Sequence, residues 1–158
     1  MISIFNEKII VGDFMLLKKI KDLRDDYDLN QVKMAEIIGV SKSNYARWET
    51  DENIIPLKHL NSVCNYFDVS MDYMVGLSKE QNYKNVNRKL NKELIGKRLK
   101  TFRNENNLSQ EALAKEINTS HSTISAYETG KTMLLTAFAY DIAKKYNISM
   151  DWLCGRID

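Results

Sequence analysis

The sequence predicts an all-α protein built from two tandem helical domains, and three observations lead to this fold class. Only one proline and six glycines occur in 158 residues, so the residues that interrupt helices are scarce. The sequence repeats itself, because the segment 14–76 aligns with 93–155 without a gap. Within each copy, apolar residues recur three and four positions apart, which is the spacing of amphipathic helices.

The two copies share polar as well as apolar positions. Both end on the same Ser-Met-Asp sequence, at 70–72 and at 149–151, and a glycine follows each. Other identical pairs are Lys18/Lys97, Arg24/Arg103, Gln31/Gln110, Ala35/Ala114, Ser41/Ser120 and Glu49/Glu128. Because the apolar positions keep their character while the surface differs, the pattern indicates a duplicated domain.

The ends of the two aligned segments predict an N-terminal extension at 1–12, a first domain at 13–77, a linker at 78–92 and a second domain at 93–158. The segment 1–77 holds nine basic and twelve acidic side chains, a net charge of −3. The linker has five basic residues and one acidic residue, and the second domain has nine basic and eight acidic residues. We therefore expect a basic, flexible spacer between an acidic domain and a weakly basic one.

Each copy is predicted to contain five short helices. The first has one apolar face, formed by Leu16, Ile20 and Leu23 in one copy and by Ile95, Leu99 and Phe102 in the other. The second begins after Asn30 or Ser109, both good N-caps. Its small central residue, Ala35 or Ala114, allows another helix to cross closely.

A sharp turn follows at Gly39 or Asn118, which are residue types that tolerate a left-handed backbone. The third helix is predicted to begin at Ser41 or Ser120. In the first copy the fourth helix should run from about Pro56 to Phe67. The fifth should be a short capped segment from the serine of each Ser-Met-Asp to the glycine after it.

A helix, a tight turn and a helix with polar outward positions form a helix-turn-helix. Leu29, Gln31, Ala35, Ile38, Gly39, Ser41, Tyr45, Trp48 and Glu49 fall at the spacing of the Cro/C1-type (XRE) helix-turn-helix family of phage and bacterial repressors, which the first copy resembles. The second copy resembles the same family through Leu108, Gln110, Ala114, Ile117, Ser120, Ile124, Tyr127 and Glu128. The resemblance implies two lambda-repressor-like domains that bind double-stranded DNA and regulate transcription, as a repressor.

In that family the third helix enters the major groove, so its outward residues are the candidate DNA contacts. Arg47 and Lys42 are suited to guanine, and Ala126 to a thymine methyl group. The resemblance adds the two glutamines, first in the second helix, as phosphate contacts. The full candidate set is Gln31, Ser41, Lys42, Ser43, Asn44, Arg47, Gln110, Ser120, His121, Ser122, Thr123 and Ala126.

The resemblance also implies an internal ion pair between the first helix and the end of the third. The pairs would be Arg24 with Glu49 and Arg103 with Glu128, and we interpret them as structural.

Two departures weaken the phosphate-binding expectation for the first copy. It has Asp51 and Glu52 where the second copy has Gly130 and Lys131, and three aspartates crowd its first turn. The second copy follows the family motif more closely, but the outward face of its third helix has Ala126 where the first copy has Arg47. One copy binding DNA while the other contacts protein is therefore an open alternative.

The main rival hypothesis is that the fold serves protein interaction or dimerisation, as in an antitoxin-like or anti-repressor factor. Residues 1–12 contain five aliphatic side chains that suit a short strand or hairpin. Such a segment either pairs with a second chain, giving a homodimer, or packs and frays at the end of the domain.

Several function classes are not expected. No nucleotide-binding, metal-binding or catalytic motif occurs, so we expect no enzyme, no catalytic residues and no cofactor. His59 and His121 lie in different copies, which argues against a metal site. The sequence contains no long apolar run and begins with early charges, which predicts a cytoplasmic protein without a membrane span. Cys64 and Cys154 are expected to be reduced core residues.

Overall fold

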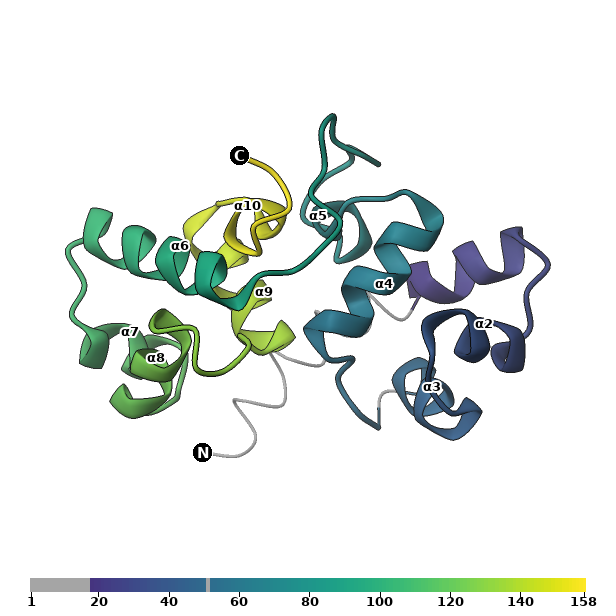
Figure 1. Ribbon diagram of the computed structural model, residues 1–158, viewed down its shortest axis with the longest axis horizontal. Helices are drawn as coiled ribbons and strands as arrows, with labels where there is room; N and C mark the ends of the chain where they lie inside the picture. Colours follow the sequence, from purple (N-terminus) through teal and green to yellow (C-terminus); the bar gives the residue numbers. More distant parts are fainter. Residues whose placement is uncertain (1–17, 51) are drawn as a thin grey trace. The chain divides into compact units, whose positions relative to one another are not determined.

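The computed structural model describes residues 18–50 and 52–158, and the chain forms two compact units, Met1–Tyr83 and Lys84–Asp158 (Figure 1). All regular secondary structure in the described residues is helical, which confirms the predicted fold class. The predicted strand or hairpin in 1–12 lies outside the described residues, as do Leu16 and Asp51.

The helices of the two units follow the same order. In the first unit, residues 18–26 are helical, and α2 (Gln31–Ile38), α3 (Lys42–Glu49), α4 (Leu57–Phe67) and α5 (Met71–Met74) follow. The second unit contains α6 (Lys92–Glu105), α7 (Gln110–Glu116), α8 (His121–Glu128), α9 (Thr136–Tyr146) and α10 (Met150–Leu153). Each helix from α7 to α10 begins at the position that the repeat aligns with the start of its counterpart, so the sequence repeat is also a structural repeat.

Side-chain caps explain where most of the short helices begin. Asn30 Oδ1 accepts a hydrogen bond from the Lys33 amide at the start of α2, and the Ser41 hydroxyl accepts one from Asn44 at the start of α3. Ser109, Ser120 and Ser149 do the same for α7, α8 and α10. Each bond satisfies an amide that an isolated helix would leave unpaired, which fixes the first turn.

The turn between the second and third helix of each unit has a left-handed residue. Gly39 has φ 75° and Asn118 has φ 58°, as their residue types predict. This turn directs the following helix, α3 or α8, across the end of the helix before it.

Each unit has its own apolar core. The first is built around Met34, Tyr45, Leu60, Val63, Met71 and Met74, and the second around Leu99, Phe102, Leu113, Ile124, Ile142 and Leu153. Cys64 and Cys154 are completely buried, one in each core, as predicted. The cores hold the third helix of each unit by its inner face, which leaves the outer face exposed.

The predicted linker makes more contacts than a flexible spacer would. Its first part returns along α5, where the Ser70 amide donates to Gln81 O at 2.6 Å and the Tyr83 hydroxyl donates to Asp72 at 3.0 Å. Later in the segment, the Asn87 amide donates to Arg156 O at 2.7 Å, within the second unit. The composition predicts a polar, flexible spacer, but groups of this segment form hydrogen bonds with backbone and carboxylate atoms at the end of each unit.

Candidate nucleic-acid interface

The third helix of the first unit, α3, has one buried face and one polar face. Tyr45 and Trp48 are buried, whereas Lys42, Ser43 and Asn44 are exposed. Arg47 is also exposed, and its Nε lies 3.7 Å from Glu52 Oε2. Lys42, Ser43, Asn44 and Arg47 therefore form an outward ridge with two cations, which we call the first reading ridge.

The corresponding helix of the second unit, α8, presents a less charged ridge. His121 and Ser122 are exposed, and Thr123 and Ala126 are half-buried; these four residues form the second reading ridge. His121 Nε2 lies 3.6 Å from Glu111 Oε1 of α7. The Ser120 hydroxyl is 3.0 Å from the Ser122 hydroxyl and 2.8 Å from the Thr123 hydroxyl, which holds these groups together at the start of the helix.

A network centred on a carboxylate holds the end of α3 in the first unit. Arg24 Nε donates to Glu49 Oε1 at 2.8 Å, and Arg24 Nη1 donates to Leu29 O at 2.6 Å. The Tyr45 hydroxyl and the Gln31 amide also donate to Glu49, each at 2.7 Å. One glutamate thus joins the first, second and third helices of the unit.

The second unit repeats this network with one donor fewer. Arg103 Nε donates to Glu128 Oε1 at 2.5 Å, and Arg103 Nη1 donates to Leu108 O at 2.9 Å. Gln110 Nε2 donates to Glu128 Oε2 at 2.8 Å. Ile124 occupies the position of Tyr45 and supplies no hydroxyl. In both units the network fixes the reading helix against the rest of the domain.

The structure gives both glutamines a partner that the sequence did not predict. The expectation for Gln31 and Gln110 was a phosphate contact, whereas each uses its side-chain amide on the glutamate of the ion pair. An amide group carries two donor hydrogens, so this bond leaves one for another acceptor. The phosphate contacts remain predictions. Sequence reasoning also missed the Tyr45 hydroxyl, although a buried tyrosine signals that its hydroxyl needs a partner.

Both network glutamates are held in the charged form. Burial disfavours the charge on Glu49, but hydrogen bonds from Arg24, Gln31 and Tyr45 outweigh it and lower the pKa of that carboxyl. Burial likewise disfavours the charge on Glu128, and hydrogen bonds from Arg103 and Gln110 outweigh it and lower the pKa of that group. The carboxylates therefore remain ionised at neutral pH despite their position.

These lowered pKa values predict acid sensitivity of both units. A carboxyl whose pKa is depressed by folding contributes stability above its unfolded value of about 4.3, and that stability is lost as the pH falls through the folded-state pKa. We expect the melting temperature to fall as the pH drops below about 5, toward and through the folded-state pKa values of the two glutamates. The Glu128→Gln variant should be less stable than the wild type at neutral pH, but its melting temperature should fall less when the pH is lowered. An equal fall in melting temperature in the variant and the wild type would contradict the stabilising role of ionised Glu128.

The arrangement offers no feature of a metal centre or a membrane segment within 18–50 and 52–158. No group of three potential ligands among His, Cys, Asp and Glu side chains is placed to hold a metal ion there. Over the same ranges, no helix has both the length and the apolar character needed to cross a bilayer.

Comparison with known proteins agrees with the duplicated geometry. The family model described as helix-turn-helix (HTH_3) matches twice, at residues 20–74 and 99–153. The two matches have the same register as the internal repeat and contain both reading helices, with the glutamines and glutamates that hold them. The chain belongs to this helix-turn-helix family. It carries two tandem copies of the Cro/C1-type domain, as the sequence predicted.

Two curated relatives match parts of the helix-turn-helix chain. The uncharacterized HTH-type transcriptional regulator YobD of Bacillus subtilis (strain 168) is 35% identical over 83 residues, which are 52% of this chain and 73% of that protein. The antitoxin PezA of Streptococcus pneumoniae serotype 4 is 34% identical over 68 residues, which are 43% of each protein. No solved structure matches significantly.

Proposed function

We propose that this protein is a sequence-specific DNA-binding transcriptional regulator, a repressor, which reads the major groove with α3 and α8. One observation carries the proposal: each unit has a helix with an exposed polar ridge. In both units, hydrogen bonds to a buried glutamate side chain hold that helix in place. A rigid helix with polar outward side chains is what direct reading of base edges requires. The match to a protein named as a transcriptional regulator supports it.

The two ridges suit different bases. Arg47 is able to donate two parallel hydrogen bonds to guanine, and Lys42 donates to the same acceptors. The ion pair between Arg47 and Glu52 is exposed on both sides, so its stabilisation is small and DNA competes with it easily. On α8, His121 and Ser122 supply weaker donors, and Ala126 supplies only a methyl group, which suits thymine.

It follows that one chain would read two unlike half-sites, the first rich in guanine and the second not. The start of the second helix contributes phosphate contacts in each unit, through Gln31 and Gln110 and the nearby amides. Ser41 and Ser120, whose hydroxyls cap the reading helices, would each donate a hydrogen bond to a phosphate oxygen. Two half-sites about 34 Å apart would correspond to one turn of the DNA helix.

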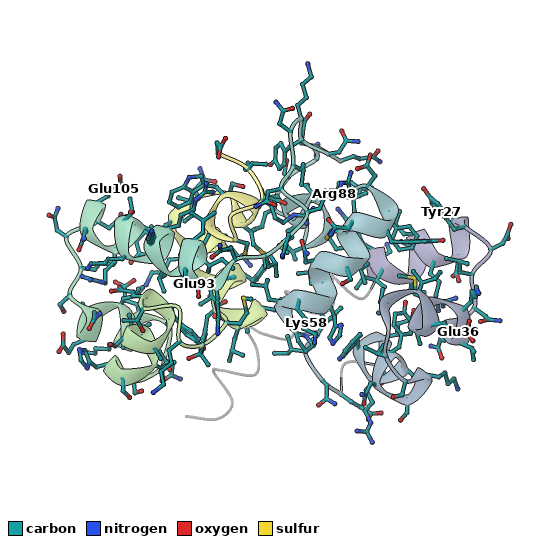
Figure 2. The ribbon with its side chains drawn as sticks, in the orientation of Figure 1. Tyr27, Glu36, Lys58, Arg88, Glu93 and Glu105 are labelled. Carbon is teal, nitrogen blue, oxygen red and sulfur yellow. The ribbon has the colours of Figure 1, made fainter. Side chains whose placement is uncertain are left out.

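Arg47→Ala tests this proposal directly. In selection from random duplexes, we expect the wild type to enrich a site with a guanine-containing half and an unlike second half. The variant should lose the guanine preference and bind about tenfold or more weakly, because a bidentate contact contributes ~1–3 kcal/mol of discrimination. Lys58→Ala is the control, because Lys58 is exposed on α4 and belongs to neither ridge (Figure 2).

Two results would count against the proposal. The first is the absence of any enriched duplex. The second is a site whose sequence and affinity are unchanged by Arg47→Ala and by the paired variant His121→Ala with Ser122→Ala. Binding should also weaken steeply with salt, with a log–log slope of about −0.9 for each neutralised phosphate.

A protein-interaction role is the second candidate, and the match to a protein named as an antitoxin favours it. Glu52 in place of Lys131, together with the aspartates of the first turn, makes the first unit the better candidate for protein contact. A selection that enriches only the site of the second unit would support this division. Whether the chain forms a homodimer is a separate proposal, which sedimentation of the purified protein tests.

A further inference from the structure

An exposed cluster of aromatic rings marks the first unit, where residues 18–26 end and where α4 ends. Tyr27 is 54% exposed and Tyr66 is 42% exposed, although their ring centroids are only 6.4 Å apart. The ring centroids of Tyr27 and Tyr66 each lie 5.0 Å from that of buried Phe67. We call Tyr27, Tyr66 and Phe67 the aromatic patch. Tyrosine is enriched at protein interfaces, so two neighbouring exposed rings indicate a candidate interaction site.

The aromatic patch has carboxylates beside it in the chain. Asp26 and Asp28 flank Tyr27, and Asp68 directly follows Phe67; all three are exposed. Asp25 is also exposed and lies 3.0 Å from Arg24. No lysine or arginine occurs at 25–28 or at 65–68, so these two segments together carry four negative charges and no positive one.

The second unit has the same backbone at these places but the opposite surface. Tyr27 and Tyr66 correspond to Asn106 and Lys145. Lys145 Nζ lies 3.0 Å from Glu116 Oε2, and the Tyr146 hydroxyl also donates to Glu116. The two matching segments, 104–107 and 144–147, hold two lysines and one glutamate. One domain therefore presents a positive polar surface where the other presents rings and carboxylates.

The fold itself does not require the aromatic and acidic residues of the first unit. Asp28 and Asp68 have left-handed backbones, with φ 54° and 53°. Asn107 and Asn147 adopt the same conformation in the second unit, with φ 54° and 52°. Since asparagine tolerates this backbone without a charge, the carboxylates are not a consequence of the turns. A role outside the fold is the better explanation.

We propose that the aromatic patch and its carboxylates are a docking site for a polypeptide segment of another protein that carries arginine or lysine with apolar residues. Tyrosine faces attract guanidinium and ammonium groups, and carboxylates pair with them. Four negative charges oppose a DNA phosphate backbone at this surface. They also oppose a symmetric dimer through the patch, because each copy would bring the same charge.

None of the patch residues belongs to a reading ridge, so docking is separable from DNA binding. A partner held here would join the regulator while Lys42, Arg47 and their neighbours remain available. The same separation allows each activity to be measured in a variant that lacks the other.

The test uses the full chain and a fluorescent peptide of alternating arginine and leucine, with an alternating glutamate and leucine peptide as the negative probe. Fluorescence anisotropy should show binding of the cationic peptide alone. Replacing Tyr27→Asn together with Tyr66→Lys installs the residues of the second unit, and we expect about tenfold weaker binding. Asp22→Asn is the matched control, because it changes the net charge by the same single unit at another exposed position of the first unit.

The control should weaken binding less than about twofold, since an exposed charge contributes little. Equal weakening in both variants would mean general charge attraction and would overturn the proposal, as would no binding of the cationic peptide. Self-association that the tyrosine variant abolishes would assign the site to a second copy and would also overturn it. Circular dichroism of the variant should match the wild type, and its DNA affinity should be unchanged.

Discussion

Glu128→Ala is expected to destabilise the second unit by ~2–4 kcal/mol and to abolish specific DNA binding through α8. The Glu128 side chain is 3% exposed and that of Arg103 is 12% exposed, so the substitution leaves a guanidinium largely buried without its counter-charge. The Gln110 amide loses its acceptor at the same time. Because Glu128 is the last residue of α8, the helix also loses its attachment to α6.

The first unit should respond more strongly to the equivalent change. Glu49 accepts hydrogen bonds from three side chains, those of Arg24, Gln31 and Tyr45, so Glu49→Ala leaves one more donor without a partner. Native-state hydrogen exchange of core amides measures the two units separately. Glu111→Ala is the control, because that side chain is 71% exposed. If Glu49→Ala and Glu128→Ala each lowered the unfolding free energy of their own unit by less than about 1 kcal/mol, the networks would not be structural.

Gly96→Ala is expected to have the second large effect, a loss of ~1–3 kcal/mol or more from the second unit. Gly96 is buried in α6 where that helix crosses the end of α8, and an added Cβ would lie 2.7 Å from Glu128 O and closer still to Tyr127 O. Backbone atoms cannot turn aside as a flexible side chain does. The two helices must therefore separate, which also moves the second reading ridge.

Gly39→Ala is the comparison variant, because it changes the backbone preference of a left-handed residue without causing a steric clash. Gly39 has φ 75° and no neighbouring atom within 4 Å of an added Cβ, so its substitution costs only the left-handed conformation, about 1–2 kcal/mol. The thermal melt of the second unit should shift only with Gly96→Ala. An unchanged second unit in that variant would contradict the close packing of α6 on α8.

Much of the fold follows from the sequence because local signals and the repeat agree. Ser41 and Ser120 cap helices where predicted, and Gly39 and Asn118 supply the left-handed turns. Duplication helps further, because core positions such as Met34/Leu113 and Tyr45/Ile124 are apolar in both copies and buried in both units. The described helix boundaries are accordingly close to the predicted ones.

The hydrogen-bond partners of polar groups were harder to predict. The resemblance predicts a phosphate contact for Gln31, which stays a prediction, but it does not indicate that the Gln31 amide also donates to Glu49 on the following helix. The contacts of Ser70 and Tyr83 in the predicted linker also depend on tertiary structure. Composition indicates that such segments are polar, but it does not show which backbone or carboxylate atom lies within reach.

The aromatic patch illustrates a different limit. Tyr27 and Tyr66 have no periodicity that distinguishes them from core residues, and they are far apart in the sequence. Only the fold shows that their rings are neighbours and exposed. Comparison of the two copies then becomes informative, because Asn106 and Lys145 show what the same positions contain without the patch.

Methylation protection on the selected duplex is the most direct test of groove reading by α3 and α8. Dimethyl sulfate methylates guanine N7 in the major groove and adenine N3 in the minor groove. We predict protection of guanine N7 in one half-site by the wild type, with loss of that protection in Arg47→Ala and its retention in Lys58→Ala. Protection of adenine N3 alone, or guanine N7 protection that Arg47→Ala leaves intact, would contradict the account.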